Sequence, residues 1–196
     1  MSSRLSLTLV ALALVLVGCD RQAPEEAQGE GELAGEKASL SATFDRSRAG
    51  ALMPAITVAD PDGTELNLAA AQGTPVLLNL WATWCAPCRA EMPALDKLQQ
   101  QAGGDDFEVV AINVDTGSDD KPKDFLAEIG VKDLAFYRED TLKLFTDVKK
   151  RGLALGLPVT FLVDEEGCLL THMNGPAEWA GADAAGWIAA ARRAAD

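Results

Sequence analysis

Residues 76–95 read VLLNLWATWCAPCRAEMPAL. The first six are almost continuously apolar, which is typical of a strand that is covered on both faces. Apolar residues then recur at helical spacing as far as Gln101, and Gly103-Gly104 ends the pattern. A second apolar run extends from Phe107 to Val114. A strand, a helix and a second strand in this order predict parallel pairing through a right-handed crossover.

Two cysteines stand where the strand passes into the helix, as Cys85-Ala86-Pro87-Cys88. The free N–H groups and the dipole of a helix start favour a thiolate at Cys85, whose pKa would fall from about 8.5 towards about 3.5–7.5. Cys88 lies one turn later and can attack a mixed disulfide formed at Cys85. Pro87 fits because first-turn N–H groups lack helical acceptors. The spacing predicts a redox pair with Cys85 as nucleophile and Cys88 as resolving thiol; the alternatives are two inert cysteines or half of a metal site.

The remaining patterns predict one α/β domain from residue 51 to residue 196, with a mixed sheet and helices on both faces. Alternating apolar residues on either side of the turn at 60–63 predict an N-terminal β-hairpin. A short helix that opens at Pro122 and a strand at Leu134–Tyr137 come next. The later elements expected are a helix with the apolar stripe Leu142, Phe145 and Val148, a hairpin of Thr160–Val163 and Cys168–Thr171, and a last helix capped by Asp183.

Composition excludes several classes of protein. The 196 residues carry 17 Lys and Arg against 30 Asp and Glu, for a net charge of −13. Without a basic cluster, this balance argues against nucleic-acid binding. Four cysteines are too few for a disulfide scaffold of this length. Beyond residue 18 the apolar residues are too dispersed for a polytopic membrane protein.

The first 18 residues are predicted to be a lipoprotein signal peptide. Arg4 precedes an apolar run from Leu5 to Val17, which is too short to span a bilayer comfortably. Leu16-Val17-Gly18-Cys19 resembles a bacterial lipobox, which would make Cys19 the lipidated first residue. The alternative is an uncleaved short anchor. Both hypotheses place the rest of the chain outside the cytoplasm.

Residues 19–50 are predicted to form a flexible acidic tether. Asp20 to Gly50 holds seven acidic and four basic residues, and too few apolar ones to offset the conformational entropy of folding. As a random coil, this segment would span roughly 30 Å. Asp20 resembles the signal that retains lipoproteins at the cytoplasmic membrane.

Residues 78–93, Leu-Asn-Leu-Trp-Ala-Thr-Trp-Cys-Ala-Pro-Cys-Arg-Ala-Glu-Met-Pro, resemble the active-site segment of thioredoxin-fold proteins of the TlpA/ResA group. Gly156–Asp164 resembles the cis-proline loop of that fold with its following strand, and Gly175–Trp179 also matches the group. Lys121–Tyr137 corresponds to the insert of the group. The similarity extends over about residues 53–194. It implies a thioredoxin-like α/β fold, a mixed central sheet flanked by helices, with an N-terminal β-hairpin and a short αβ insert.

The resemblance implies a redox-active disulfide, Cys85–Cys88, and a surface that binds an extended substrate beside it. Pro158 would be cis and would lie against the cysteine pair; the alternative is a trans proline at a strand start. The other substrate-binding residues implied are Leu157, Trp84 and Pro87. Trp84, next to Cys85, is expected to report the redox state.

Glu91 resembles the active-site carboxylate of the group. Such a carboxylate would exchange protons and raise the pKa of the thiols by like-charge repulsion. The alternative is a solvated helix glutamate. Asn79 stands where plain thioredoxins keep a buried acid, and this departure shifts proton handling towards Glu91.

Cys168 and His172 could join Cys85 and Cys88 as the four ligands of a zinc ion. The predicted hairpin argues against this set, because it puts Cys168 beyond the far turn, about 15 Å from Cys85 at about 3.3 Å per residue. We therefore predict no metal site, a buried and inert Cys168, and an ordinary edge histidine at His172.

These features predict a thiol–disulfide oxidoreductase that needs no cofactor and is lipid-anchored on the periplasmic side of the bacterial cytoplasmic membrane. The resemblance implies a reductant for protein thiols, such as those of apocytochrome c or copper-site proteins of respiratory oxidases. It also implies a membrane electron donor of the CcdA/DsbD type. A thiol peroxidase is one alternative, although Ala82 stands where such an enzyme needs Thr or Ser. A copper-binding chaperone is the other, although the chain lacks C-x-x-x-C and a Met-rich pair.

Overall fold

A computed structural model of the chain describes residues 45–55, 57–59, 65–67 and 73–194. The predicted signal peptide, Cys19 and most of the predicted tether lie outside these residues. Among the helices that are described, none has both the length and the apolar character needed to cross a membrane.

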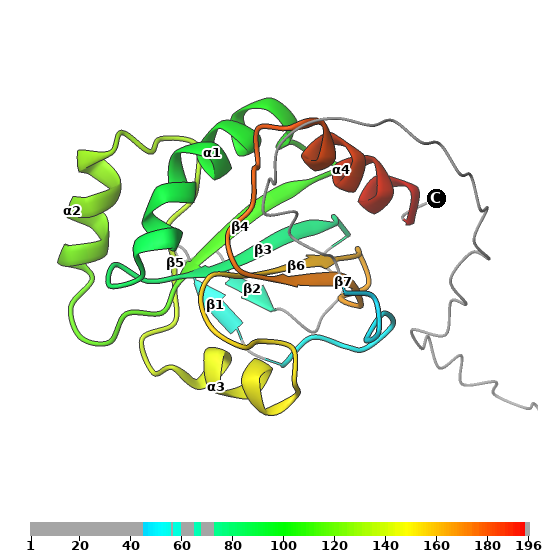
Figure 1. Ribbon diagram of the computed structural model, residues 1–196, viewed down its shortest axis with the longest axis horizontal. Helices are drawn as coiled ribbons and strands as arrows, with labels where there is room; N and C mark the ends of the chain where they lie inside the picture. Colours follow the sequence, from blue (N-terminus) through cyan, green and yellow to red (C-terminus); the bar gives the residue numbers. More distant parts are fainter. Residues whose placement is uncertain (1–44, 56, 60–64, 68–72, 195–196) are drawn as a thin grey trace, which may run out of the picture.

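A seven-stranded sheet runs through the domain in the order β2-β1-β5-β4-β3-β6-β7 (Figure 1). At its centre, β3 (Val76–Trp81) pairs parallel with β4 (Glu108–Asn113) and antiparallel with β6 (Val159–Val163). Every residue of β3 is buried, as the apolar run predicts. The other strands are β1 (Thr57–Ala59), β2 (Glu65–Asn67), β5 (Tyr137–Arg138) and β7 (Leu169–Asn174).

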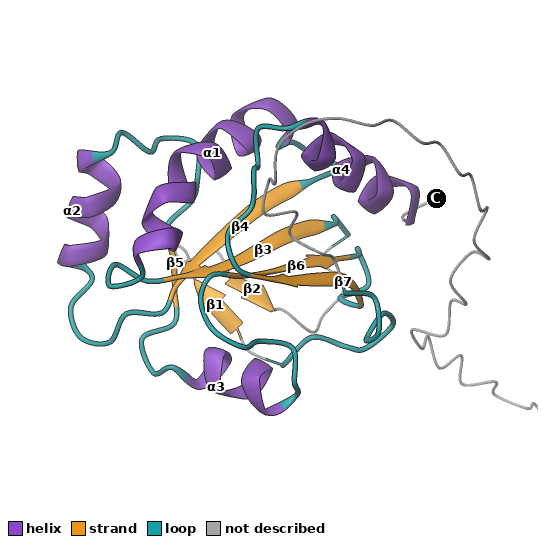
Figure 2. Cartoon of the chain, viewed as in Figure 1, coloured by secondary structure: helices purple, strands orange, loops and turns teal. Residues whose placement is uncertain are grey.

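The helices cover both faces of the sheet, with α1 and α4 on one side and α3 on the other (Figure 2). The α1 helix continues through Pro93 and buries the apolar stripe of Cys88, Met92, Leu95 and Leu98. A mixed sheet between helices, with an N-terminal hairpin of β1 and β2, confirms the predicted thioredoxin-like α/β fold. The helices are α1 (Ala86–Ala102), α2 (Asp120–Glu128), α3 (Lys143–Lys150) and α4 (Ala182–Ala194).

Two predicted element boundaries are wrong. The insert strand was expected at Leu134–Tyr137, but β5 spans only Tyr137–Arg138. The reason is the Asp96 carboxylate of α1, which accepts the N–H groups of residues 132–134 at 2.7–3.0 Å and ties them to the helix. Asp183 was expected to cap the last helix, but α4 already begins at Ala182.

The N-terminal segment 45–53 follows the outer edge of β7. Asp45 exchanges backbone hydrogen bonds with His172, at 2.8 and 3.0 Å, and Gly50 and Ala51 bond to Leu169. The hydrogen-bonded domain therefore includes residues 45–50, which the sequence pattern places in the tether. This segment also covers His172, which is fully buried and stacks on Phe161 rather than standing at an exposed edge.

Candidate active site

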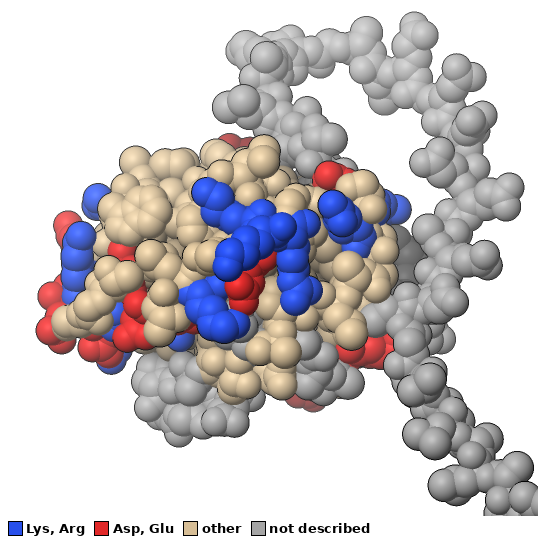
Figure 3. All heavy atoms as spheres, turned by 90° about the horizontal axis from the view of Figure 1, so that it is seen from below, with Lys and Arg blue, Asp and Glu red and all other residues tan. Residues whose placement is uncertain are grey.

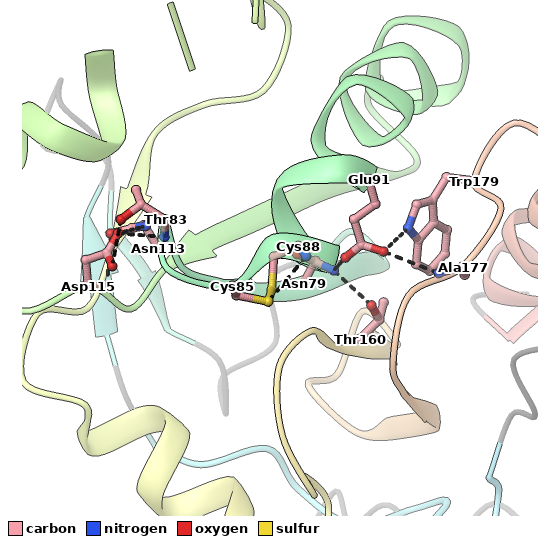
Figure 4. Close-up of a disulfide and its surroundings, with 10 residues drawn as sticks. All are labelled: Asn79, Thr83, Cys85, Cys88, Glu91, Asn113, Asp115, Thr160, Ala177 and Trp179. Atoms are coloured by element: carbon pink, nitrogen blue, oxygen red, sulfur yellow. Dashed lines mark hydrogen bonds between the residues drawn. A yellow bond between two sulfur atoms is a disulfide. The ribbon is translucent and has the colours of Figure 1, made fainter. Parts of the chain in front are cut away.

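The two cysteines of the motif form a disulfide at the start of α1 (Figure 4). Cys85 is the N-cap residue, and its sulfur accepts the backbone N–H of Cys88 at 3.3 Å. That N–H and the helix dipole stabilise negative charge on the Cys85 sulfur. Cys88 has no exposed surface, whereas Cys85 retains 6%. The pair thus presents Cys85 to an incoming substrate.

The Leu157–Pro158 peptide bond is cis, the conformation that the family resemblance implies. Asn174 of β7 holds the loop before it, because its side chain accepts the N–H of Leu155 at 2.6 Å and donates to the carbonyl of Leu153 at 3.3 Å. Pro158 also accepts the N–H of Gly175 at 2.9 Å. Sequence reasoning missed Asn174, whose only signal was its place beside the Gly175–Trp179 motif.

Two large apolar side chains are exposed on the loops that carry the cysteines and the cis-proline. Trp84, directly before Cys85, is 62% exposed, and Leu155, three residues before Pro158, is 80% exposed. Because both side chains belong to loops of the same site, they form a candidate binding surface. Leu155 was not among the predicted substrate-binding residues, because only the tertiary structure reveals that it points outward.

Glu91 is buried, with 5% of its surface exposed, and is not a solvated helix glutamate. One carboxylate oxygen accepts the amide of Asn79 at 2.9 Å. The other accepts the indole N–H of Trp179 at 3.0 Å and the backbone N–H of Ala177 at 3.3 Å. Burial raises the pKa of the Glu91 carboxyl above its ordinary 4.5, although these three hydrogen bonds oppose the shift. A buried carboxyl with a raised pKa stays protonated to a higher pH than an exposed glutamate does, and it is a candidate for proton exchange at the site.

Asn79 connects Glu91 to the sheet. Its amide donates to Glu91 and also to the hydroxyl of Thr160 on β6, at 3.0 Å (Figure 4). The residue that replaces the buried acid of plain thioredoxins is therefore a direct partner of Glu91. Trp179 was not predicted as a site residue, and its signal was its place in the Gly175–Trp179 motif.

A second buried network holds the loop that leads to Cys85. The carboxylate of Asp115 accepts the backbone N–H of Thr83 at 3.0 Å, its hydroxyl at 3.2 Å, and the amide of Asn113 at 2.9 Å. Figure 4 shows this group on the side of the loop away from the disulfide. The Thr83 hydroxyl is thus engaged with Asp115 and is not turned towards Cys85, where a peroxide would bind.

Replacing Asp115 by alanine is expected to lower the free energy of unfolding by about 2–3 kcal/mol, because three donors lose a buried acceptor. Chemical denaturation followed by tryptophan fluorescence measures this change. Asp124→Ala, at an exposed position on α2, is the control and should leave the free energy of unfolding almost unchanged. Equal stability of the two variants would contradict a structural role for Asp115.

The structure does not bring Cys168 and His172 to the cysteine pair. The potential metal ligands that lie within 4.8 Å of one another, among the residues described, are Asp164, Glu166 and Cys168. The Asp164 carboxylate already accepts the N–H groups of Glu166 and Cys168, at 3.0 and 2.8 Å, and so closes the turn between β6 and β7. Cys168 is buried and is not a free thiol.

Comparison with known proteins agrees with this geometry. The family model described as Redoxin matches residues 48–186, which include the disulfide, Glu91 and the cis-proline. The chain belongs to the Redoxin family.

Relatives with known names are described as thiol–disulfide exchange proteins. HelX of Rhodobacter capsulatus, a thiol:disulfide interchange protein, is 38% identical over 131 residues, which cover 65% of this chain and 69% of HelX. The thiol-disulfide oxidoreductase ResA of Bacillus cereus is 28% identical over 137 residues, which cover 67% and 72%.

A solved structure from Chlorobium tepidum, described as a thiol:disulfide interchange protein DsbE, aligns with 74% of this chain and 97% of its own. Its TM-score is 0.61 and its sequence identity is 27%. Together with the Cys85–Cys88 pair, these relatives establish a Redoxin-family thiol–disulfide oxidoreductase of the ResA/HelX/DsbE type, and they confirm the predicted thiol–disulfide oxidoreductase activity.

Proposed function

We propose that this oxidoreductase is a reductant that keeps the cysteines of target proteins in the thiol form. The observation that carries the proposal is the buried carboxyl of Glu91, three residues after Cys88 and on the same buried face of α1. A negative charge on that face disfavours a thiolate at the cysteine pair. Since an oxidant such as DsbA owes its potential to a stabilised reduced form, destabilising the thiolate makes the pair a stronger reductant.

The reaction runs as two exchange steps. The Cys85 thiolate attacks one sulfur of a substrate disulfide, forms a mixed disulfide and releases the other substrate sulfur as a thiolate. Cys88 loses its proton and attacks the Cys85 sulfur, which closes the Cys85–Cys88 disulfide and releases the second substrate thiol. Glu91 would accept the proton of Cys88. Two electrons pass to the substrate, and a dithiol donor must return them.

The substrate surface is formed by residues of two loops around the pair. Trp84 and Pro87, which flank Cys85, and Leu155 on the opposing loop are exposed, whereas Leu157 is half-buried and Pro158 is buried. An extended segment of a protein would lie between these loops, with its disulfide at Cys85. We propose apocytochrome c or a copper-site protein of a respiratory oxidase as the target, and a membrane protein of the CcdA/DsbD type as the electron donor.

The proposed location is the periplasmic side of the cytoplasmic membrane, with an anchor in residues 1–19. The lipobox-like residues 16–19 and the acidic composition of residues 20–44 support this location. The two alternative functions find no support in the described residues, because Thr83 is turned to Asp115 and His172 is buried away from the disulfide.

The reduction potential of the full chain tests the direction of electron flow. Trp84 fluorescence, read in dithiothreitol and glutathione buffers, should give a potential nearer to the thioredoxin value of about −270 mV than to about −120 mV. A potential near about −120 mV would make the protein an oxidant and overturn the proposal.

A further inference from the structure

Two segments that are far apart in the sequence bring six cations to one side of the molecule. Residues 45–52 follow β7, and residues 143–152 form α3 and the turn after it; we call them together the basic face. The acidic residues within these segments are Asp45 and Asp147, although the whole chain carries a net charge of −13. The cations, all exposed, are Arg46, Arg48, Lys143, Lys149, Lys150 and Arg151.

The view from the side of α3 shows these charges gathered over the middle of the surface, around a small acidic group (Figure 3). Direct contacts join the two segments. Arg151 donates to the carbonyl of Leu52 at 3.0 Å. The Arg48 guanidinium lies beside Gly152, where it would be 3.7 Å from the Cβ of any larger residue. The basic face is therefore one continuous surface.

An exposed apolar side chain lies within the basic face. Leu52 is 52% exposed, and Arg151 holds its backbone. The Lys149 ammonium lies 5.4 Å from the ring centroid of Phe145, so the lysine stem covers a half-buried aromatic ring. Cations that surround an exposed leucine are the arrangement that peripheral proteins present to a membrane surface.

We propose that the basic face binds the anionic headgroups of phospholipids in the membrane that carries the chain. The inference rests on the proposed N-terminal membrane anchor. Each Lys or Arg near an anionic bilayer adds to the attraction between the protein and the membrane surface. Screening limits charge interactions to a Debye length of about 8 Å, so the local cations outweigh the distant carboxylates of this acidic protein.

The path of the chain favours a membrane over an acidic protein as the partner. Residues 1–44 join the domain at Asp45, which belongs to the basic face. An N-terminal anchor would thus tether the chain at the edge of this surface, and the cations of the basic face would then turn it towards the bilayer. Residues 153–158 lead from α3 to the cis-proline, so docking of α3 would set the direction in which the active site faces a membrane-embedded electron donor.

The test uses the full chain in lipid nanodiscs of phosphatidylcholine alone or mixed with phosphatidylglycerol. Acetylation of lysine amines, read by mass spectrometry, reports which lysines the bilayer covers. Lys149 and Lys150 should react several-fold more slowly in anionic discs than in neutral ones, and high salt should remove the difference. Lys97 and Lys132, which are exposed elsewhere, should react at the same rate in both discs.

A charge-reversal pair provides the matched control. In anionic discs the bilayer should also slow the acetylation of Lys143. The variant Lys149→Glu/Lys150→Glu should remove this protection of Lys143, whereas Lys97→Glu/Lys132→Glu should leave it in place. Equal reactivity of Lys149 and Lys150 in both kinds of disc would overturn the proposal. Protection by soluble polyglutamate but not by anionic discs would also overturn it, in favour of an acidic protein partner.

Failure of the proposed function would be visible separately. If size-exclusion chromatography separates the chain from neutral discs, the proposed anchor is wrong. If the chain stays with anionic discs but its lysines are not protected from acetylation, only the docking of the basic face is wrong. In detergent solution, Lys149→Glu/Lys150→Glu should reduce a substrate disulfide at the same rate as the original sequence, because neither lysine belongs to the active site.

Discussion

Cys88→Ser is expected to lower the turnover of a disulfide substrate by about 10³-fold or more and to trap the substrate on Cys85. The sulfur of Cys85 accepts the backbone N–H of Cys88, and serine keeps that N–H, so the first attack should persist. The second step needs a thiol within one turn of Cys85, and a serine hydroxyl cannot displace the substrate sulfur. Peptide mapping by mass spectrometry after mixing with oxidised glutathione measures the adduct.

Cys85→Ser is the matched control, and it should give neither turnover nor an adduct at this site, because Cys88 is fully buried. A rapid adduct on Cys88 in that variant would reverse the assignment of nucleophile and resolving thiol. Persistent turnover in Cys88→Ser would show that a thiol from another molecule resolves the mixed disulfide.

Glu91→Gln is expected to shift the reduction potential to a less negative value, by about 30 mV if the carboxylate changes the thiol free energies by about 1.4 kcal/mol. Without the negative charge on the buried face of α1, the thiolate form is less disfavoured and the reduced state gains stability. Titration in dithiothreitol and glutathione buffers measures the potential. Glu128→Gln, at an exposed position on α2, should leave the potential unchanged.

The same variant should change how stability depends on pH. The pKa of Glu91 is raised above 4.5 in the folded state. At pH values between the unfolded-state and folded-state pKa, Glu91 is therefore protonated in the folded chain and ionised in the unfolded chain. This contribution to stability is complete below pH 4.5 and is lost as pH rises through the folded-state pKa. The free energy of unfolding of the original chain, relative to that of Glu91→Gln, should thus be highest at low pH and should fall as pH rises. Urea denaturation at several pH values measures this change. A difference that is constant with pH would contradict the raised pKa.

Local patterns were enough to place the elements that depend on neighbouring residues. The apolar run at 76–81, the following helical spacing and the N-cap position of Cys85 are read from neighbouring residues, and β3 and α1 lie where these patterns put them. Secondary-structure periodicity and helix capping act over a few residues, so they remain legible in a single sequence. The resemblance to the TlpA/ResA group added the fold and singled out Glu91 and Pro158.

Which side chains meet became visible only in the folded chain. The partners of Glu91 come from β3 and from residues 177–179, the Asp96 carboxylate shortens the insert strand, and residues 45–53 bury His172. The basic face shows the same effect, since Arg46 and Arg48 lie in one segment and Lys149-Lys150-Arg151 in the other, and only folding brings the two segments to one surface. Contacts between residues about a hundred positions apart arise when the sheet and helices pack together, and no local pattern in the sequence records them.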